Sequence, residues 1–417
     1  MTKRIRHSLI SLFLLQGGQY LASLILLPIL AQRLGVEGYG EMGFCLAMTA
    51  YLGLLVEWGY GVTSTKAIAI SRGDISAQSR IFWNTFCGKL LLLSIAALGL
   101  LLITEMSPAF LSSSSLLWLA FGMVVANGIA PNFFYQGVEK LEVLFSINVG
   151  LRFLSIPLIM AFVHDADDVG IAQGIVSGAV IFAALINLSL LGHLKLVQWI
   201  RPELRTIYLD MRAAAPLFLS MAALGLFANS LTVILGYASG VAAVGAFTAA
   251  LNLYKAAQGI FAPLYQIMFP RFSHLFHHDD AEGLRMLKRV LIRQTPLTML
   301  VAGCLAISAP WVLPLLLGSN FDSAILVFQW MCLALVLNGI ANIIGGQLMV
   351  ALNHHLFYTK AVLVAGFISL PTAWLMNLWV GDIGSVWAML IFETLIISIC
   401  VIGLSRFNPQ ILKALQS

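Results

Sequence analysis

The sequence predicts an all-helical (all-α) integral membrane protein with about twelve transmembrane helices. The 417-residue chain is 60% hydrophobic and only 10% charged, and its mean hydropathy is +0.94. A soluble domain could not cover so much apolar surface with polar groups. Apolar runs of about 20 residues recur along the chain, each long enough as a helix to cross a hydrocarbon core of about 30 Å. Period-2 alternation is missing from the sequence, which argues against a membrane β-barrel.

These runs define the expected helices in chain order. The first run is longer than the apolar core of a signal peptide, and no A-x-A cleavage site follows it, so we expect it to remain in the mature chain. The predicted spans are 8–32, 42–64, 81–104, 116–136, 143–163, 170–190, 213–237, 244–266, 295–317, 323–346, 357–378 and 384–404.

Basic residues are distributed unevenly among the connections between these spans. The chain ends and the even-numbered connections, with Lys360 at a span edge, contain 19 of the 23 Lys and Arg residues, whereas the odd-numbered connections contain only Arg33. Because basic loops stay on the cytoplasmic side, both termini are expected in the cytoplasm. The net charge of +5 therefore reports topology and does not indicate a nucleic-acid partner.

Two short segments recur at a spacing close to half the chain length. LGVEGYG at 34–40 is echoed by SGVAAVG at 239–245, at an offset of 205 residues. FLSIP at 153–157 is echoed by FISLP at 367–371, at an offset of 214 residues. The glycines of the first pair would permit a tight turn at the first hairpin of each half.

We therefore expect two parallel bundles of six helices, one in residues 1–200 and one in residues 201–417. Parallel repeats of this kind are related by a pseudo-twofold axis along the membrane normal. The substrate cleft would then lie between the two halves.

Several motifs resemble those of bacterial polysaccharide flippases of the Wzx type. PNFFYQGVEK at 131–140 is similar to their P-x-W/F-x-x-Q-G-x-E-K/R segment. The order and spacing of further motifs resemble the multidrug/oligosaccharidyl-lipid/polysaccharide (MOP) exporter superfamily, which includes the MATE transporters, and the resemblance covers nearly the whole chain. Those motifs are LGVEGYG, FPRFSHLFHHDD at 269–280, LPLLLGSNFDSA at 313–324 and GGQLMVALNHH at 345–355. Glu57 departs from the family, which often carries Asp at this position.

The resemblance implies a flippase rather than an enzyme, and no cofactor. Its implied substrate is an undecaprenyl-pyrophosphate-linked oligosaccharide, the repeat unit of O-antigen or a related surface polysaccharide. Alternating access would move this lipid from the cytoplasmic to the periplasmic leaflet of the bacterial inner membrane, with H+ or Na+ as candidate coupling ions. The implied partners are membrane lipid, a polysaccharide polymerase and a chain-length regulator.

Charged residues inside apolar spans should face a polar cavity or an ion-pair partner, because such a charge costs at least about 2.5 kcal/mol in the membrane. Arg152 shares a polar stripe with Asn148, and Lys255 shares one with Asn252. Gln16 belongs to a similar row in the first span. A guanidinium fork and a mobile ammonium suit a pyrophosphate, and amides can bind sugar hydroxyls.

Three further charged residues complete the predicted site. Lys89 is a third candidate cation, although it lies near a span end and could instead reach the cytoplasmic surface. Glu57 and Glu393 are candidate ion-coupling residues or, alternatively, counter-ions of the cations. Three cations against two carboxylates leave one positive charge in excess for an anionic head group.

Other classes of function are less well supported. The five cysteines show neither CxxC nor Cys/His spacing, so no metal site is expected. HDADD at 164–168 superficially resembles an acidic metal motif of a membrane glycosyltransferase or polymerase, but so short a connection offers no room for an active site. A multidrug exporter of the same superfamily is the nearer alternative, and its organic cations would favour a cavity of net negative charge.

The segment 271–294 is expected to form a cytoplasmic amphipathic helix after a histidine-rich turn. Leu284, Leu287 and Leu291 share one face of this helix. Such a pattern is typical of a helix that lies at the lipid surface.

Overall fold

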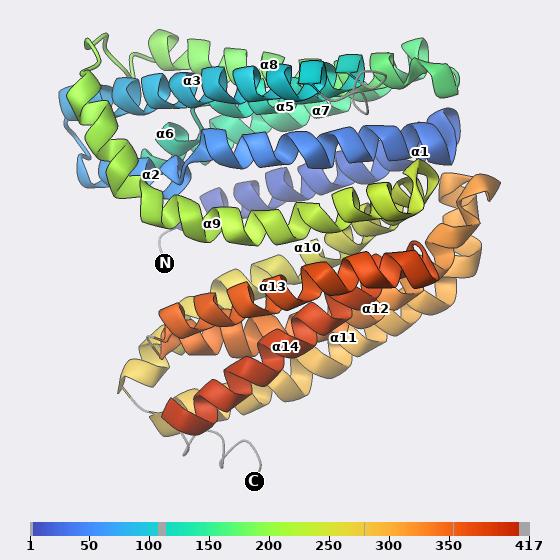
Figure 1. The fold of residues 1–417 in the computed structure, drawn as a ribbon. Helices are drawn as coiled ribbons and strands as arrows, with labels where there is room; N and C mark the ends of the chain where they lie inside the picture. Colours follow the sequence, from blue (N-terminus) through green and yellow to red (C-terminus); the bar gives the residue numbers. More distant parts are fainter. Residues whose placement is uncertain (1–2, 107–113, 279, 353, 408–417) are drawn as a thin grey trace. The chain divides into compact units, whose positions relative to one another are not determined.

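The computed structural model describes residues 3–106, 114–278, 280–352 and 354–407, and these residues are almost entirely helical (Figure 1). In the first part of the chain the helices are α1 (Lys3–Glu57), α2 (Tyr60–Ile70), α3 (Ile75–Met106), α5 (Ser114–Ile129), α6 (Asn132–Gly137), α7 (Leu141–Phe162), the short η1 (Ala166–Asp168), α8 (Val169–His193) and α9 (Leu204–Ser239). They are followed by α10 (Val241–His278), α11 (Asp280–Leu317), η2 (Ser319–Phe321), α12 (Asp322–Ala341), the π-helix η3 (Asn342–Met349), α13 (His355–Val380) and α14 (Ile383–Phe407).

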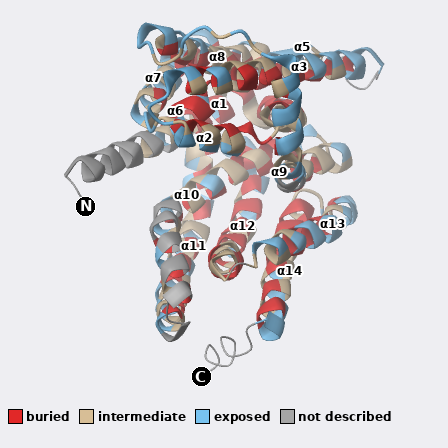
Figure 2. Cartoon of the chain, turned by 90° about the vertical axis from the view of Figure 1, so that its left-hand side faces the viewer, coloured by how far each residue is buried: buried red, intermediate tan, exposed pale blue. Residues whose placement is uncertain are grey.

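Within the described residues, nine helical segments are long and apolar enough to cross a membrane. One of them, Gly17–Ile70, covers the second predicted span, 42–64, and the part of the first that begins at Gly17. α9 contributes a shorter apolar stretch, Gly225–Ser239. Exposed residues lie along several helices (Figure 2). They include large apolar side chains such as Leu98 and Phe367. A bilayer accommodates such faces, and the chain is a multi-pass membrane protein.

The two repeated glycines, Gly35 and Gly240, both have a positive φ. α1 is interrupted at Gly35, where φ is 68°, and the chain turns back there (Figure 1). Gly240 separates α9 from α10 with φ of 87°. An added Cβ would meet nothing within 4 Å at either position, so the left-handed backbone, and not a lack of space, favours glycine.

The second predicted span, 42–64, is not one continuous helix, and the prediction of its C-terminal end is wrong. α1 stops at Glu57, and the next two residues, Trp58 and Gly59, have φ of 46° and 79°. α2 then begins at Tyr60. The apolar composition continues through this point, so hydropathy alone could not reveal the break.

Contacts divide the chain into two compact units, Met1–Asn229 and Ser230–Ser417, so that α9 continues from one unit into the other. In the first unit, the short helix α6 packs against α2. Gly137 allows this approach, because an added Cβ would lie 2.7 Å from Cγ2 of Ile68. Phe133 and Phe134 of α6 are buried in a cluster with Phe82 of α3.

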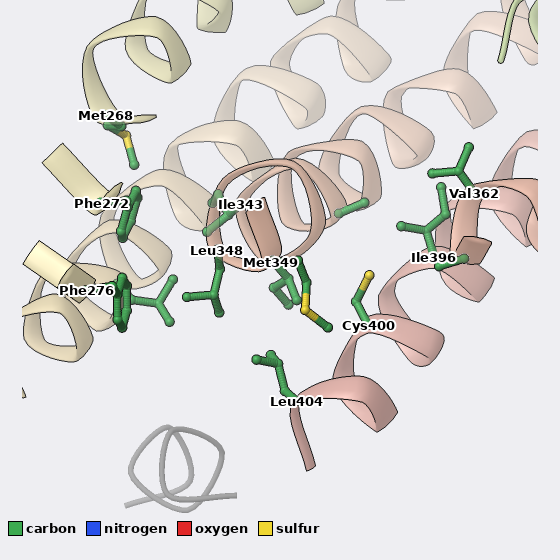
Figure 3. Packing of buried hydrophobic residues seen from close by; sticks show 14 of the residues in the cluster. Met268, Phe272, Phe276, Ile343, Leu348, Met349, Val362, Ile396, Cys400 and Leu404 are labelled. Carbon is green, nitrogen blue, oxygen red and sulfur yellow. The ribbon is translucent and has the colours of Figure 1, made fainter. Parts of the chain in front are cut away.

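In the second unit, an apolar cluster joins α10, α11, α13, α14 and η3 (Figure 3). Phe272 and Phe276 of α10 and Leu287 of α11 are buried in it, with Leu284 and Leu291 packed at its edge. The expectation of a separate helix at the lipid surface is therefore wrong. Its leucine face belongs to the core, and its residues from Asp280 onward are continuous with the following span in α11.

Candidate functional site

An ion pair joins the half-buried Glu57 of α1 to the buried Lys89 of α3 in the first unit. Lys89 Nζ lies 3.0 Å from Glu57 Oε2 and donates to Asn127 Oδ1 of α5 at 3.4 Å. Glu57 Oε1 accepts a 2.8 Å hydrogen bond from the backbone N–H of Gly61, and Asn127 Nδ2 donates to the carbonyl of Gly53 at 3.5 Å. We call Glu57, Lys89 and Asn127 the N-terminal polar cluster.

The ammonium of Lys89 is directed into this unit. The Lys89 side chain is only 3% exposed, and its Nζ lies 6.0 Å from the ring centre of Phe133. Lys89 therefore does not extend to the surface in this conformation. A buried ammonium needs a close counter-ion to offset its lost hydration, and Glu57 supplies it.

The polar stripe of α7 is divided between two environments. Asn148 Oδ1 accepts a 3.1 Å hydrogen bond from Asn187 of α8, so this amide is engaged within the unit. The Arg152 side chain is exposed, and no hydrogen bond or ion pair joins it to another described residue. Arg152 is thus a membrane-depth cation without a counter-ion in the part of the chain that the structure describes.

A second polar cluster lies in the second unit. Asn338 of α12 donates from Nδ2 to Glu393 Oε1 of α14 at 2.8 Å. Gln258 of α10 donates from Nε2 to Asn338 Oδ1 and to the Tyr254 hydroxyl, both at 3.0 Å. Glu393 is 8% exposed, and no salt bridge links it to any residue in the described ranges. We call Tyr254, Gln258, Asn338 and Glu393 the C-terminal polar cluster.

The remaining predicted residues are placed as follows. Lys255 is exposed on α10, next to the C-terminal polar cluster in sequence, and has no ion-pair partner among described residues. Asn252 is half-buried on the same helix. Gln16 lies outside the residues whose side chains are described.

Sequence reasoning missed the two asparagines that organise these clusters. Asn127 and Asn338 are separated by 211 residues, an offset between the two repeat offsets of 205 and 214. Both lie inside an apolar span, and each contacts the intramembrane charged group of its own unit. A search for polar residues that recur at the repeat spacing would have found them.

Two conspicuous motifs have structural roles. In HDADD, Asp165 and Asp168 form a capping box around η1, and Asp168 Oδ2 also accepts a 2.8 Å hydrogen bond from the backbone N–H of His164. No group of three His, Cys, Asp or Glu residues suited to a metal occurs within the described ranges. In PNFFYQGVEK, the buried Tyr135 hydroxyl donates to the carbonyl of Asn187 at 2.8 Å, which fastens α6 to α8.

Arg33, the one basic residue of the odd-numbered connections, caps the C-terminal end of α7. Its guanidinium donates to the carbonyl of Met160 at 2.7 Å and to the carbonyl of Val163. These carbonyls lie at the end of the helix, where they have no intrahelical donor.

Comparison with known proteins agrees with this architecture. The chain matches the family described as polysaccharide biosynthesis protein over residues 5–276. It is 28% identical over 395 residues to a candidate O-antigen transporter of Escherichia coli (strain K12), with 95% of each chain covered.

Two solved structures share the fold. One is the inward-facing conformation of a multidrug resistance MATE family transporter of the MOP superfamily, with a TM-score of 0.70, 15% identity and 95% of each chain covered. The other is the lipid II flippase MurJ in its inward closed conformation, with a TM-score of 0.67, 13% identity, and 98% of this chain and 89% of that chain covered.

These similarities confirm the predicted all-helical membrane fold, and the proteins named are transporters or a flippase rather than enzymes. The family match extends over more than half of the residues. The chain therefore belongs to the polysaccharide biosynthesis protein family.

Proposed function

We propose that this protein is a flippase that moves an undecaprenyl-pyrophosphate-linked oligosaccharide, the repeat unit of O-antigen or a related surface polysaccharide, across the bacterial inner membrane. Its family and its 28% identical relative, a candidate O-antigen transporter, support this assignment. Alternating access from the cytoplasmic to the periplasmic leaflet is the proposed mechanism, with both termini in the cytoplasm. Reporter fusions after residues 165 and 320 should then read periplasmic, and fusions after 75, 200 and 280 should read cytoplasmic.

The observation that carries the proposal is the pair of exposed cations, Arg152 and Lys255. Lys89 is neutralised by Glu57, whereas neither of these two has a recorded counter-ion in the described parts of the chain. An uncompensated membrane charge is costly unless it meets water or an anion. A pyrophosphate that leaves its hydration shell needs such donors, and sugar hydroxyls can bind Asn148, Asn252 and Gln16.

Glu393 is the proposed ion-coupling residue. Its carboxylate contacts the amide of Asn338 and has no cationic partner among the described residues, so a proton or a sodium ion can exchange there without breaking an ion pair. Glu57 is the weaker candidate, since Lys89 already compensates its charge. A polymerase and a chain-length regulator are the proposed downstream partners.

Deletion of the gene in its host tests the function. We expect surface polysaccharide to be lost and lipid-linked oligosaccharide to accumulate in the cytoplasmic leaflet, with both defects reversed by the wild-type gene. Sensitivity to organic cations without any change in surface polysaccharide would instead indicate a multidrug exporter. Unchanged sidedness of the lipid-linked oligosaccharide would contradict the proposal.

A further inference from the structure

The break between α1 and α2 lies directly beside the N-terminal polar cluster. Trp58 adopts a left-handed backbone conformation, with φ of 46°. This conformation is unfavourable for a bulky residue, and it persists only where surrounding contacts impose it. Those contacts should therefore control the conformation of the neighbouring residues.

The contacts that impose the break come from α9. The Trp58 indole stacks on Phe218, with ring centres 4.2 Å apart and planes 13° apart, and its Nε1 donates to the carbonyl of Met211 at 2.9 Å. At Gly59, an added Cβ would lie 3.3 Å from the backbone N of Phe218 and 3.4 Å from the carbonyl oxygen of Ala214. α9 thus packs closely against both residues of the break, Trp58 and Gly59.

The break also positions Glu57. Glu57 is the last residue of α1, and its two carboxylate oxygens join the first turn of α2, through the N–H of Gly61, to Lys89 of α3. If the backbone at Trp58 returned to an ordinary helical conformation, the Glu57 carboxylate could not keep both contacts. Lys89 would then lose its counter-ion.

α9 contains a point at which it can bend between its two contacts with Trp58. Pro216 lies between Met211 and Phe218 and has no N–H to donate to the carbonyl of Arg212, so the helix is weakened there. α9 also continues into the second unit. A change in α9 can therefore reach the N-terminal polar cluster through Trp58.

We propose that Trp58 and Gly59 form a latch, held closed by α9, that keeps Glu57 on Lys89. Release of α9 during the transport cycle opens the latch and frees the Lys89 ammonium for an anionic phosphate head group. The latch rests on the contacts described above, and the role of the freed ammonium rests on the proposed function. Trp58 is a positioning residue in this scheme.

A reversible cross-link between α1 and α9 tests whether the latch must open. Cysteines at Leu54→Cys and Gly225→Cys suit a disulfide, because the Cβ position of residue 225 lies 3.2 Å from Leu54 Cγ, and Trp58 stays intact. The control is Leu119→Cys of α5 with Gly174→Cys of α8, bridged by a short bifunctional thiol reagent, because an added Cβ at residue 174 would lie 3.8 Å from Leu119 Cδ2. Both cysteine pairs are introduced into a variant in which the five native cysteines are replaced by alanine.

Oxidation of the α1–α9 pair should lower transport about tenfold or more, within the usual range of coupling between sites, and reductant should restore it. The control cross-link should leave transport unchanged. A purely structural contact between Trp58 and α9 predicts the opposite, since locking a static contact does no harm. Full transport with α1 and α9 cross-linked would overturn the latch.

A second measurement needs no substrate and so separates the latch from the proposed function. Purified protein is treated with a small amine-reactive reagent, and modification of Lys89 is measured by mass spectrometry, with the exposed Lys195 as internal control. Trp58→Leu, which removes the stacking and the indole N–H, should make Lys89 reactive, and Trp58→Phe, which keeps an aromatic ring, should do so less. Equal protection of Lys89 in all three proteins would also overturn the proposal.

Discussion

The two polar clusters each hold a carboxylate at membrane depth, but the partners of the two carboxylates differ. In the N-terminal polar cluster, Glu57 is neutralised by Lys89, and Asn127 assists the ammonium. In the C-terminal polar cluster, Asn338 lies 211 residues further along the chain than Asn127, but its partner is Glu393 and the described residues provide no cation. Glu57 thus has a tethered ammonium as its counter-ion, whereas Glu393 is the residue at which we propose that a cation or proton exchanges.

The largest effect is expected from breaking the ion pair. Lys89→Met leaves Glu57 as an uncompensated carboxylate and should lower the free energy of unfolding by about 3–5 kcal/mol. Adding Glu57→Gln should restore most of that loss, because neither remaining side chain is charged. Thermal unfolding in detergent and the abundance of the protein in the membrane measure the loss and its recovery. Equal stability of the single and double variants would refute the pairing.

The two asparagines should differ in importance although their separation of 211 residues lies between the two repeat offsets. Asn338→Leu removes the recorded donor to the Glu393 carboxylate and should cost about 1–3 kcal/mol when that group is ionised. Asn127→Leu should cost less than about 1 kcal/mol, because Lys89 remains 3.0 Å from Glu57. The free energies of unfolding of the two variants, measured side by side at neutral pH, test this order. A larger loss of stability from Asn127→Leu than from Asn338→Leu would contradict it.

A further, moderate effect should be shared by the two units. Gly35→Ala and Gly240→Ala each place a Cβ on a left-handed backbone and should cost about 1–2 kcal/mol. Gly178 provides the control, since an added Cβ there also meets nothing within 4 Å but the backbone is helical, so Gly178→Ala should be neutral or stabilising. A clear difference between the Gly35 and Gly240 variants would show that the two turns are not equivalent.

The sequence was informative wherever the physical cause is local. Hydropathy identified the apolar spans, and the glycines at 35 and 240 marked turns that need a positive φ. Features imposed from a distance could not be read in this way. Trp58 takes its unusual backbone conformation from α9, whose contact residue Met211 lies 153 positions further along the chain.

The candidate site shows the same division. The charges inside the spans were visible in the sequence, but the pairing of Glu57 with Lys89 joins residues 32 positions apart on different helices. The leucine face at 284–291 was recognised as amphipathic, and its partner was misjudged because the phenylalanines that cover it belong to another helix, α10. Periodicity reveals that a face is apolar, but it does not reveal what packs against it.

The account depends most on the two exposed cations, and one measurement tests them directly. The double variant Arg152→Ala, Lys255→Ala is compared with wild type for surface polysaccharide, at matched abundance of the protein in the membrane. We predict that display is lost at normal abundance, and that Lys255→Arg retains more activity than Arg152→Lys, because a point charge cannot replace a bidentate fork. Normal display from the double variant would contradict the cationic substrate site.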